Sequence, residues 1–419
     1  MTLDVRKIDP AVGEIIAKLT NQGHEAYIVG GAVRDLLLGI TPKDYDIATS
    51  ARPEEVKRVF GRRARLIGRR FRLVHVYGAG NIYEVCTFRR EPTAAERSTR
   101  ESDDGITIWN DNEFGTRDQD AIRRDFTVNA IYYDPLKEGR LLDPLGGVPD
   151  LRAGVVRMIG DPAIRLAEDP VRLLRALKLV AHYGLRLEPA LDRAVHHLAP
   201  RIASSSRARC FEELLKIMAK PWVFKTFAVC QEYGLLHHFW PNLAAAWTGA
   251  EGALLQRLLE LRDHRMREDN AFLKSKTLGL ATLAYASVTA RREKSRHAQA
   301  TAAGGADEPP DIRHALREFY EPYTVPRFLQ ARTCDAILMV PRLLDSEPVE
   351  HLVRHPQYRY ARELAYLLSG AEGWDTLELD LWPSPPEHVR APREQHDHQR
   401  QPRRFGRDPR HAHKGNAYP

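Results

Sequence analysis

The sequence predicts an α+β protein in which a mixed sheet with helices comes first and an all-helical part follows. Strand-like apolar runs and short helical segments alternate up to about residue 150, where the turn residues of DPLGGVPDLRAG end the pattern. From Ile164 onward, apolar residues recur at helical spacing. At 419 residues the chain is too long for one compact core, so we expect about two or three folded domains.

The predicted organisation has four parts. We expect a first domain over residues 1–150, two helical domains over residues 151–240 and 241–385, and a disordered basic tail over residues 386–419. From residue 387 the chain has seven Arg and one Lys against four acidic residues. Such a tail either adds non-specific affinity for a polyanion or is merely solvated. RHAQATAAGGADEPP, residues 296–310, predicts a mobile loop because it is small, polar and rich in Pro and Gly.

The chain opens with a predicted amphipathic helix within residues 1–25. Its apolar residues fall on one helical face, namely Val12, Ile15, Ile16 and Leu19. The apolar run that follows, ending at Ile28 and Val29, predicts a buried strand. After it, AVRDLLLG predicts a short helix that ends at Gly39.

Gly30 and Gly31 join this strand to the short helix. Because they have no Cβ, they let backbone N–H groups approach a phosphate closely. Arg34 lies in the first turn of the helix, so amides, a helix N-terminus and a guanidinium together predict an anion site suited to a triphosphate. Alone, a Gly-Gly pair is only a turn; the residues that follow favour the functional interpretation.

Two carboxylates come next, at Asp44 and Asp46. Side chains alternate along a strand, so both aspartates project from the same side. Close carboxylates repel each other unless a cation lies between them, which favours a divalent metal such as Mg²⁺, or Mn²⁺ in its place. An Asp-x-Asp pair alone is more often part of a solvated loop or a helix cap. Beside the glycine turn it predicts a metal site.

Two further segments offer carboxylates. In RRDFTVN, an extended backbone places Asp125, Thr127 and Asn129 on one face, directly after a pair of arginines that ends at Arg124. The alternative is an exposed strand edge with surface arginines. In IYEVCTFRR, Glu84 alternates with apolar positions, so it either faces the same metal as the aspartates or is a sheet-face residue with a nearby arginine partner.

A helix is predicted to begin at Asp169, since Asp is a good N-cap and Pro170 a good first helical residue. Arg172, Arg175 and Lys178 recur at three-residue spacing and lie on one face of this helix. A carboxylate acceptor with arginine donors behind it could hydrogen-bond to the edge of a nucleobase. Without this context, a basic stripe is usually a solvated helix face.

In this order and spacing, the motifs resemble the class II nucleotidyltransferases of the polymerase β superfamily, which includes the tRNA CCA-adding enzymes and the bacterial poly(A) polymerases. The resemblance covers residues 20–240 and rests on GGAVRD, KDYDIAT, RRDFTVNAIYYD, DPLGGVPDLRAGVVRMIGDP and EDPVRLLRALK. It implies a nucleotidyltransferase head that holds ATP and metal, followed by a helical neck and body that bind RNA.

The resemblance also implies a role for each matching residue. Asp44 and Asp46 would bind Mg²⁺, and Asp125 would complete the catalytic acids, ahead of Glu84. The residues implied to hold the nucleotide are Gly30, Gly31, Arg34, Arg124, Asn129, Asp169, Arg172 and Arg175, of which the last three would read the incoming base without a template. Where the family usually has Arg, this chain has Lys178, a point charge rather than a planar fork.

The implied reaction is in-line attack of an RNA 3′-hydroxyl on the α-phosphorus of ATP, with two metal ions and release of pyrophosphate. LIGRRFRLVHV, residues 66–76, resembles the segment typical of the poly(A) polymerase branch, and we expect its Arg69, Arg70 and Arg72 to contact RNA. The alternative for this segment is an exposed basic loop without a partner. We therefore expect a poly(A) polymerase that acts in RNA processing and decay. The alternatives are a CCA-adding enzyme and a catalytically idle RNA-binding protein.

Bulk properties agree with a polyanionic partner. The formal net charge is +7, which alone does not distinguish RNA from DNA or a membrane surface. The four cysteines stand far apart without metal-site spacing, as expected in a reducing compartment. The N-terminus has no apolar signal segment and no apolar run approaches the length of a membrane span. We expect a cytoplasmic monomer.

Overall fold

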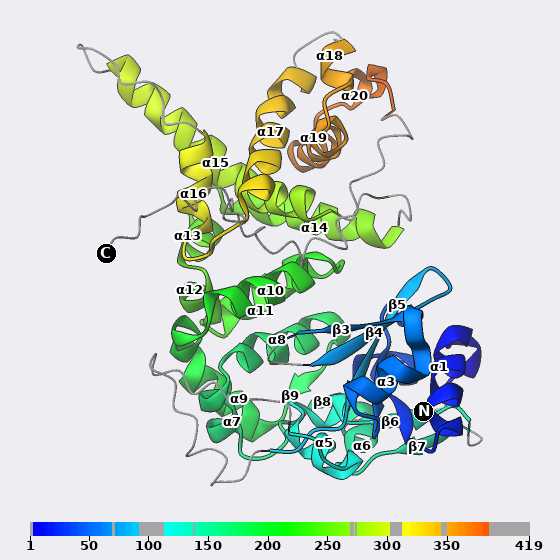
Figure 1. Ribbon diagram of the computed structural model, residues 1–419. Coiled ribbons are helices and arrows are strands. Elements are labelled where there is room, and N and C mark those ends of the chain that lie inside the picture. The colour runs from blue at the N-terminus through cyan, green and yellow to red at the C-terminus, as the bar shows by residue number, and fades with distance from the viewer. Residues whose placement is uncertain are drawn as a thin grey trace, which may run out of the picture.

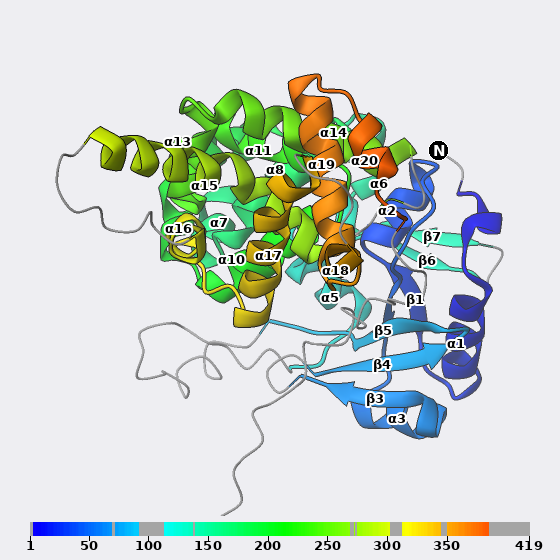
Figure 2. The same ribbon diagram turned by 90° about the horizontal axis from the view of Figure 1, so that it is seen from above.

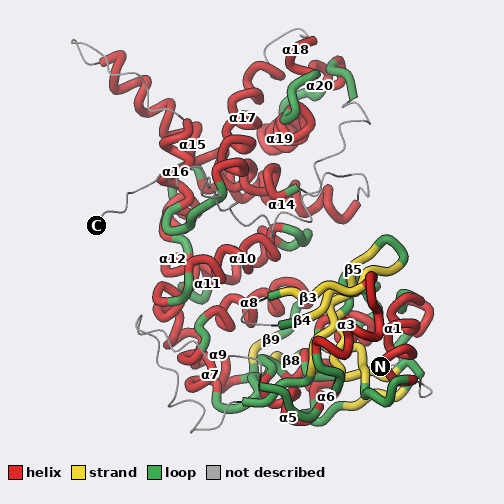
Figure 3. Tube along the Cα trace, in the orientation of Figure 1, coloured by secondary structure: helices red, strands yellow, loops and turns green. Residues whose placement is uncertain are grey.

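The structure, a computed structural model, describes residues 3–68, 72–91, 113–136, 139–268, 272, 275–301, 312–344 and 350–384. The molecule is elongated, with a β-sheet at one end and helices stacked away from it (Figure 1, Figure 3). Three of the expectations above fall outside the described residues: Arg69 and Arg70, residues 302–310 of the predicted loop, and the tail over residues 386–419.

Seven strands form one sheet in the order β3-β4-β5-β2-β1-β6-β7. Their bounds are β1 Ala26–Val29, β2 Asp46–Thr49, β3 Ala64–Ile67, β4 Leu73–Gly78, β5 Asn81–Thr87, β6 Tyr132–Asp134 and β7 Arg140–Leu142. β2 and β5 run parallel, whereas the other neighbouring strands are antiparallel. The predicted mixed sheet in the N-terminal part is therefore confirmed.

Helices α1 (Pro10–Asn21), α2 (Gly31–Leu37) and α3 (Pro53–Phe60) pack against one face of the sheet. The apolar stripe predicted for the first helix is buried there, as Val12, Ile15, Ile16 and Leu19. Seen from above, α1 lies on one side of the strands and the helical part of the molecule on the other (Figure 2).

The second face of the sheet carries a smaller apolar cluster that includes Ala48 and Phe88. Because side chains alternate along a strand, Asp46 projects from the same face as Ala48, and Glu84 from the same face as Phe88. Both carboxylates are exposed where this cluster ends. One face of the sheet therefore builds the core, while the other has an apolar part and an open, acidic part.

After the sheet the described chain is almost entirely helical. α5 Arg117–Arg123 lies between β5 and β6, and the helices that follow the sheet are α6 Gly147–Arg152, α7 Pro162–Glu168, α8 Val171–Tyr183, α9 Pro189–Leu198, α10 Arg207–Met218, α11 Val223–Glu232, α12 Leu235–Phe239, α13 Pro241–Thr248, α14 Gly252–Glu268, α15 Lys276–Thr301, α16 Ile312–Tyr320, α17 Arg327–Leu344, α18 Glu350–Val353, α19 Tyr358–Glu372 and α20 Leu377–Leu381. Short 3₁₀ helices cover Val5–Lys7, Gly61–Arg63, Thr127–Asn129 and Ala199–Ser204.

Several boundaries differ from the sequence prediction. α8 begins at Val171 with Pro170 as its N-cap, and Asp169 caps only through its carboxylate, which accepts a hydrogen bond from the Val171 N–H at 3.3 Å. Two short strands, β8 (Val155–Val156) and β9 (Arg186–Leu187), pair in parallel within the part predicted to be all-helical.

The predicted loop start at residue 296 is wrong, because α15 continues to Thr301. RHAQAT begins this segment with Ala, Gln and Arg, which are good helix formers, and the glycines come only afterwards.

The helical part has its own aromatic core. The fully buried indole of Trp240 donates to the carbonyl oxygen of Phe319 at 2.8 Å, and Tyr323 packs edge-on against it with ring centroids 5.6 Å apart. These contacts join α12 and α13 to α16, so segments almost eighty residues apart in sequence form one layer. No helix in the described part of the chain is long and apolar enough to cross a membrane.

Candidate active site

A cleft of about 1570 Å³ lies between the open face of the sheet and the helices α8, α10 and α11. Almost every site residue predicted from sequence lines it, and the set is Gly30, Gly31, Arg34, Asp44, Asp46, Arg124, Asp125, Asn129, Asp169, Arg172 and Arg175. Glu84 and Lys178, whose roles were left open, line it too. Arg72 does not: it pairs with Glu54 of α3 at 2.5 Å, outside the cleft lining.

The acidic part of the cleft is built by neighbouring strands. Asp46 is the first residue of β2, and it lies in register with Val29 of β1 on one side and Glu84 of β5 on the other. Burial at the cleft floor raises the pKa of Asp46 to about 6, with added repulsion from Glu84 and Asp44 that Arg124 offsets in part. The side chain still touches solvent, so it is within reach of a cation from the cleft.

This donor set fits a magnesium ion that is held jointly with a nucleotide. The described residues contain no group of three or more His, Cys, Asp or Glu arranged to hold a metal by themselves. Mg²⁺ is commonly bound by one or two carboxylates, with phosphate oxygens and water completing its shell. Asp44 and Asp46 supply two carboxylates. Burial raises the pKa of Asp46, and Glu84 and Asp44 add repulsion that a bound cation would relieve.

The glycine turn passes close to these carboxylates. Gly30 has a φ of +75°, and a Cβ built on it would lie 3.4 Å from Nη1 of Arg124 and 3.8 Å from Oδ2 of Asp46. A side chain at this position would therefore be strained and would enter the space between a guanidinium and a carboxylate. The predicted turn is confirmed, with a physical need for glycine at its first residue.

The guanidinium of Arg34 is largely occupied by hydrogen bonds to other side chains of the protein. Its side chain is 9% exposed, and its Nε and Nη2 donate to Oδ1 of Asp35 at 3.1 and 2.8 Å. The remaining contacts run from Nη1 to Oδ1 of Asn129 at 2.6 Å and from Nη2 to the hydroxyl of Tyr183 at 2.5 Å. Four of the five guanidinium N–H groups are thus engaged. Contact of Arg34 with a triphosphate stays a prediction.

A ring of polar contacts starts from Arg34 and ties the middle of α8, at Arg175, and its last residue, Tyr183, to the sheet domain. Asn129 accepts from Arg34 and donates through Nδ2 to Oδ1 of Asp125 at 3.0 Å. Oδ2 of Asp125 forms an ion pair with Nη2 of Arg175 at 2.8 Å. Arg175 and Tyr183 both belong to α8, so the ring closes through two turns of one helix.

The backbone around Asp125 is not extended as expected. Residues Thr127–Asn129 form a 3₁₀ turn, which brings Asn129 back over Asp125 and sends the hydroxyl of Thr127 away to Oδ2 of Asp150 at 2.7 Å. Burial raises the pKa of Asp125, but Arg175 and the hydrogen bond from Asn129 outweigh it, so the net shift is downward. Asp125 is thus an ionised, buried anchor, and its part as a third catalytic acid stays a prediction.

Arg124 stands between the acidic residues and the turn. Its Nη2 pairs with Oδ2 of Asp120 at 2.9 Å, and its guanidinium lies over the ring of Tyr132, 5.4 Å from the ring centroid. Burial lowers the pKa of Arg124, but Asp120 and Tyr132 outweigh this effect. The net shift of the pKa is upward, so the guanidinium stays charged. A fixed positive charge beside Gly30 and Asp46 suits an anionic ligand.

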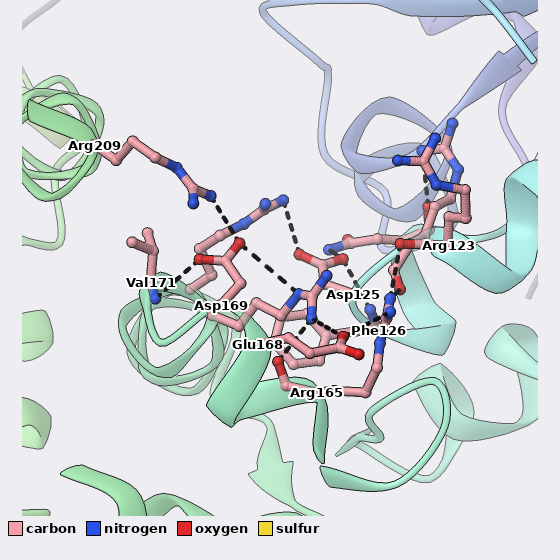
Figure 4. A network of polar contacts seen from close by, with 12 residues as sticks. Arg123, Asp125, Phe126, Arg165, Glu168, Asp169, Val171 and Arg209 are labelled. Carbon is pink, nitrogen blue, oxygen red and sulfur yellow. Dashed lines mark hydrogen bonds and ion pairs between the residues drawn. The ribbon is translucent and has the colours of Figure 1, made fainter. Parts of the chain in front are cut away.

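A second network fixes the start of α8 (Figure 4). Arg209 reaches from α10 to Oδ2 of Asp169 at 2.7 Å. Nη1 of Arg172 donates to the carbonyl oxygen of Arg165 at 2.7 Å, and Arg165 donates in turn to the carbonyl oxygens of residues 123 and 124 at 2.9 and 3.0 Å. Of the predicted base-reading residues, Asp169 is therefore held by Arg209 and Arg172 by the carbonyl oxygen of Arg165.

Lys178 belongs to a separate cluster on the helical side of the cleft. The buried Glu213 of α10 accepts from Nζ of Lys178 and from Nζ of Lys216, both at 2.9 Å. Burial raises the pKa of Glu213, but the two ammonium groups outweigh it and lower the pKa to about 2. The lysine is thus placed as a point charge beside a carboxylate, away from the Asp169 network.

Several residues at or beside the site were not indicated by any sequence pattern, among them Tyr183, Arg209, Glu213 and Lys216. Tyr183 lies eight residues, about two turns, after Arg175 on the same helix, so its face could have been predicted. The other three come from α10, which nothing in the sequence places next to α8. Only tertiary packing brings Lys216 into the cleft lining, and Arg209 and Glu213 into contact with Asp169 and Lys178.

Comparison with known proteins agrees with this geometry. The family model described as the poly A polymerase head domain matches residues 26–157, and that described as a probable RNA and SrmB-binding site of polymerase A matches residues 184–246. Poly(A) polymerase I of Haemophilus influenzae is 36% identical over 381 residues, which cover 88% of this chain and 82% of that protein.

CCA-adding enzymes are similar over a smaller part of the sequence. That of Geobacillus stearothermophilus is 36% identical over 230 residues, which cover 55% of this chain and 54% of that enzyme. Among solved structures, the Bacillus stearothermophilus CCA-adding enzyme in complex with CTP aligns with a TM-score of 0.57 and 26% identity, covering 87% of this chain and 78% of that one. The sequence match to the poly(A) polymerase extends over most of both proteins, and the chain belongs to the poly(A) polymerase I family of nucleotidyltransferases.

Proposed function

We propose that this chain adds AMP from ATP to the 3′ ends of RNA without a template, and so acts in RNA processing and decay in the cytoplasm. The observation that carries the proposal is the pairing of two elements across one cleft. Exposed carboxylates at the start of β2 line the same cleft as an Asp–Arg edge that is held by contacts within the protein. Such an arrangement can select the base of an incoming nucleoside triphosphate with side chains, and can place the α-phosphate of that nucleotide beside the acidic residues.

The carboxylates define the reaction end of the cleft. Asp44 and Asp46 would hold Mg²⁺, which supplies activation of the RNA 3′-hydroxyl and neutralisation of the triphosphate when bound. Arg124, held by Asp120 and stacked on Tyr132, offers a fixed positive charge for the phosphates next to the glycine turn. Glu84, in register with Asp46, is a candidate third acid alongside Asp125.

Base selection is proposed to lie at the start of α8. Arg209 and the neighbouring backbone fix Asp169, and the Arg165 carbonyl fixes Arg172, so the hydrogen-bonding edge keeps one orientation. An adenine that matches this edge satisfies its polar groups. A cytosine leaves some of them unpaired, at a cost of ~1–3 kcal/mol for each group.

The expected domain boundaries separate these functions. We propose that residues 1–150 carry catalysis, that residues 151–240 hold the nucleotide and part of the RNA, and that residues 241–385 bind RNA further from the reacting end. The matched head and RNA-binding segments support this division. The chain is proposed to work as a monomer.

The proposal is tested by extension of a labelled RNA 3′ end with Mg²⁺ and each of the four nucleoside triphosphates supplied separately. We expect a long ladder with ATP alone. Incorporation of CTP followed by a single A, and only on tRNA ends, would make the chain a CCA-adding enzyme instead. RNA binding without any extension would identify an idle RNA-binding protein.

Asp46→Ala should abolish AMP transfer while leaving the fold intact, because Asp46 is exposed at the cleft floor and accepts no hydrogen bond needed by the core. Activity and the circular dichroism melting curve should be measured on the same preparation. Near-normal turnover of the folded variant would refute the metal assignment.

A further inference from the structure

The cleft has a third wall that neither the carboxylates nor the base-reading edge uses. It is formed by the end of α10, the turn at residues 219–222 and the start of α11. The side chains that line it are Lys216, Ile217, Lys220, Trp222 and Thr226. Lys216 and Lys220 are cationic, and Trp222 is the aromatic residue of the five.

Trp222 is half-buried and sits between rings and charges. Its indole lies against the imidazole of His182 on α8, with ring centroids 5.6 Å apart and planes inclined by 41°. Lys225 and Arg267 approach the indole as cation–π partners, at 5.2 and 5.0 Å from its centroid. Burial lowers the pKa of His182 to about 4, so its ring stays neutral at physiological pH.

The turn that carries Trp222 is held rigidly by the helical body. The carbonyl oxygen of Trp222 accepts from the hydroxyl of Thr226 at 2.6 Å, and that of Pro221 accepts from Nη1 of Arg267 at 3.1 Å. Behind the turn, Asp263 accepts from the N–H of Phe224 at 2.8 Å.

Arg262 completes this hold from α14. Its fully buried guanidinium donates to the carbonyl oxygen of Met218 and, at 3.5 Å, to that of Lys220. A buried ion pair between Arg262 and Asp263 adds little net stability because both groups lose their hydration. Here its polar atoms fix the position of one turn at the edge of the cleft.

The chemistry of this wall is that of a site for single-stranded nucleic acid. Non-specific sites of this kind combine cations that follow the phosphates with aromatic rings on which bases stack. Lys216 lines the same cleft as Glu84 and Asp46. Burial raises the pKa of both carboxyls, and the charge of Lys216 offsets part of this rise, so the wall lies near the acidic residues. An RNA end lying on this wall would have its 3′-hydroxyl directed toward those carboxylates.

We propose that Trp222, with His182 beside it and Lys216 and Lys220 along the wall, forms the subsite that stacks the 3′-terminal base of the RNA. The proposal rests on the proposed function, which assigns the incoming ATP base to the start of α8 and so leaves this wall to the RNA. Because every base has a π-face, the subsite accepts any 3′-terminal nucleotide. Trp222 thereby sets the affinity for RNA and not the choice of nucleoside triphosphate.

The first test compares Trp222→Ala with Trp222→Phe in the full chain, with Trp374→Ala as the control. Trp374 is exposed and does not line the cleft. Trp222→Ala should raise the KM for RNA about 5- to 150-fold, the range expected for one lost stacking contact, and should leave the KM for ATP within twofold. Trp222→Phe should restore most of the affinity, and Trp374→Ala should change neither constant.

A modified RNA isolates the stacking contact. RNA whose 3′-terminal nucleotide lacks its base should bind the unsubstituted protein as weakly as intact RNA binds Trp222→Ala, and the substitution should then have no further effect. Independent losses from the two changes would overturn the proposal. So would an equal rise of the KM for ATP, which would assign the wall to the nucleotide.

Photocrosslinking tests the same site without catalysis. RNA with 4-thiouridine at its 3′ end, irradiated on the protein without ATP, should label the peptide that contains Trp222. Labelling elsewhere would overturn the inference even if Trp222→Ala failed to fold. If the unsubstituted protein extended no RNA with ATP, the proposed function would fail, whereas the crosslink would still report where RNA binds.

Discussion

Asn129 uses both ends of its side-chain amide inside the protein. The oxygen accepts from Arg34 and the nitrogen donates to Asp125, so this residue joins a cation to an anion through one planar group. A carboxylate has the same shape but accepts only. The position therefore requires an amide for its hydrogen-bonding pattern and not merely for its size.

We expect Asn129→Asp to lower kcat/KM for ATP about 10- to 100-fold. The new carboxylate would repel Asp125 and remove one hydrogen bond to a charged group, which is worth about 1.5–3 kcal/mol. Steady-state kinetics with saturating RNA give the measurement. Tyr183→Phe, which removes one hydroxyl from the same ring, should cause a smaller loss. Full activity of Asn129→Asp would show that the ring does not position the nucleotide site.

Glu84 and Asp46 are neighbours in register. Burial raises the pKa of Asp46, and the charge of Glu84 raises it further. Mg²⁺ binding to the nucleotide-free protein should therefore weaken as the pH falls through about 6, where Asp46 takes up a proton. Glu84→Gln removes the repulsion, so it should move this midpoint to lower pH.

Titration calorimetry with Mg²⁺ between pH 5 and 8 measures the midpoint. Glu168→Gln is the matched control, since Glu168 lies outside the cleft lining. An unchanged midpoint in Glu84→Gln would mean that the two carboxylates do not share the metal region.

At this scale the sequence was a good guide to which residues matter and a weaker guide to what they touch. The Gly-Gly turn and the Asp-x-Asp pair have local geometry that residue type alone implies, and both lie in the cleft. The engagement of Arg34 with Tyr183 depends on where α8 lies, which no local pattern encodes.

The helix α8 is the element that joins the two sides of the cleft. Its start is fixed by Arg209 of α10, its middle by Asp125, and its last residue by Arg34. Sequence analysis predicted the helix and its basic face correctly. It did not predict the turn at Thr127–Asn129, because alternating polar and apolar residues are compatible with a strand until packing chooses between them.

Between α8 and α10, Glu213 provides a pH-dependent contact. Its pKa is lowered from 4.5 to about 2, so the folded state gains stability above pH 4.5 and loses it as the pH falls toward 2. The gain is up to about 3 kcal/mol, and the loss of hydration at Lys178, whose pKa is lowered by burial, reduces it.

Glu213→Gln should therefore be less stable than the unsubstituted protein at pH 7, with the difference shrinking between pH 4.5 and 2.5. Urea unfolding at a series of pH values measures the free energy of unfolding. The same difference at both ends of the range would contradict the assigned pKa. Glu168→Gln, on a side chain that is 49% exposed, should show little change at any pH.

At the scale of the whole molecule, the buried ion pair between Arg262 and Asp263 connects the helical body to the cleft. Arg262 and Asp263 hold the turn before α11 from behind, while that turn contributes to the cleft in front. The aromatic layer of α12, α13 and α16 stabilises the body independently of this contact. The body therefore positions the cleft wall through these contacts, to which Arg267 adds its hydrogen bond to the carbonyl oxygen of Pro221.

Arg262→Met should lower the free energy of unfolding by about 3–5 kcal/mol, because Asp263 would be left buried without its partner. Burial already raises the pKa of Asp263 to about 6, against the opposing charge of Arg262. Arg257→Met, an exposed change on the same helix, should stay within about 0.5 kcal/mol. Urea denaturation monitored by circular dichroism measures the free energy of unfolding of both variants. Equal values for Arg262→Met and Arg257→Met would contradict the role given to the ion pair.

At the largest scale, the predicted α+β class and the succession of sheet and helices are confirmed, since both follow from hydrophobic periodicity along the chain. The sequence could not predict which helices meet. Glu213 and Lys216 reach the acidic face only because α10 stacks on α8, and that contact depends on the shapes of two apolar surfaces.

The edge at Asp169 is held by an ion pair and by backbone carbonyls, so turning it toward another base would break several contacts at once. We expect the same edge to meet every incoming nucleotide, however many have been added before. An edge of fixed orientation would select the same base at every addition, so the RNA would be extended by a homopolymer. The uniform composition of the added nucleotides would then follow from the rigidity of this edge.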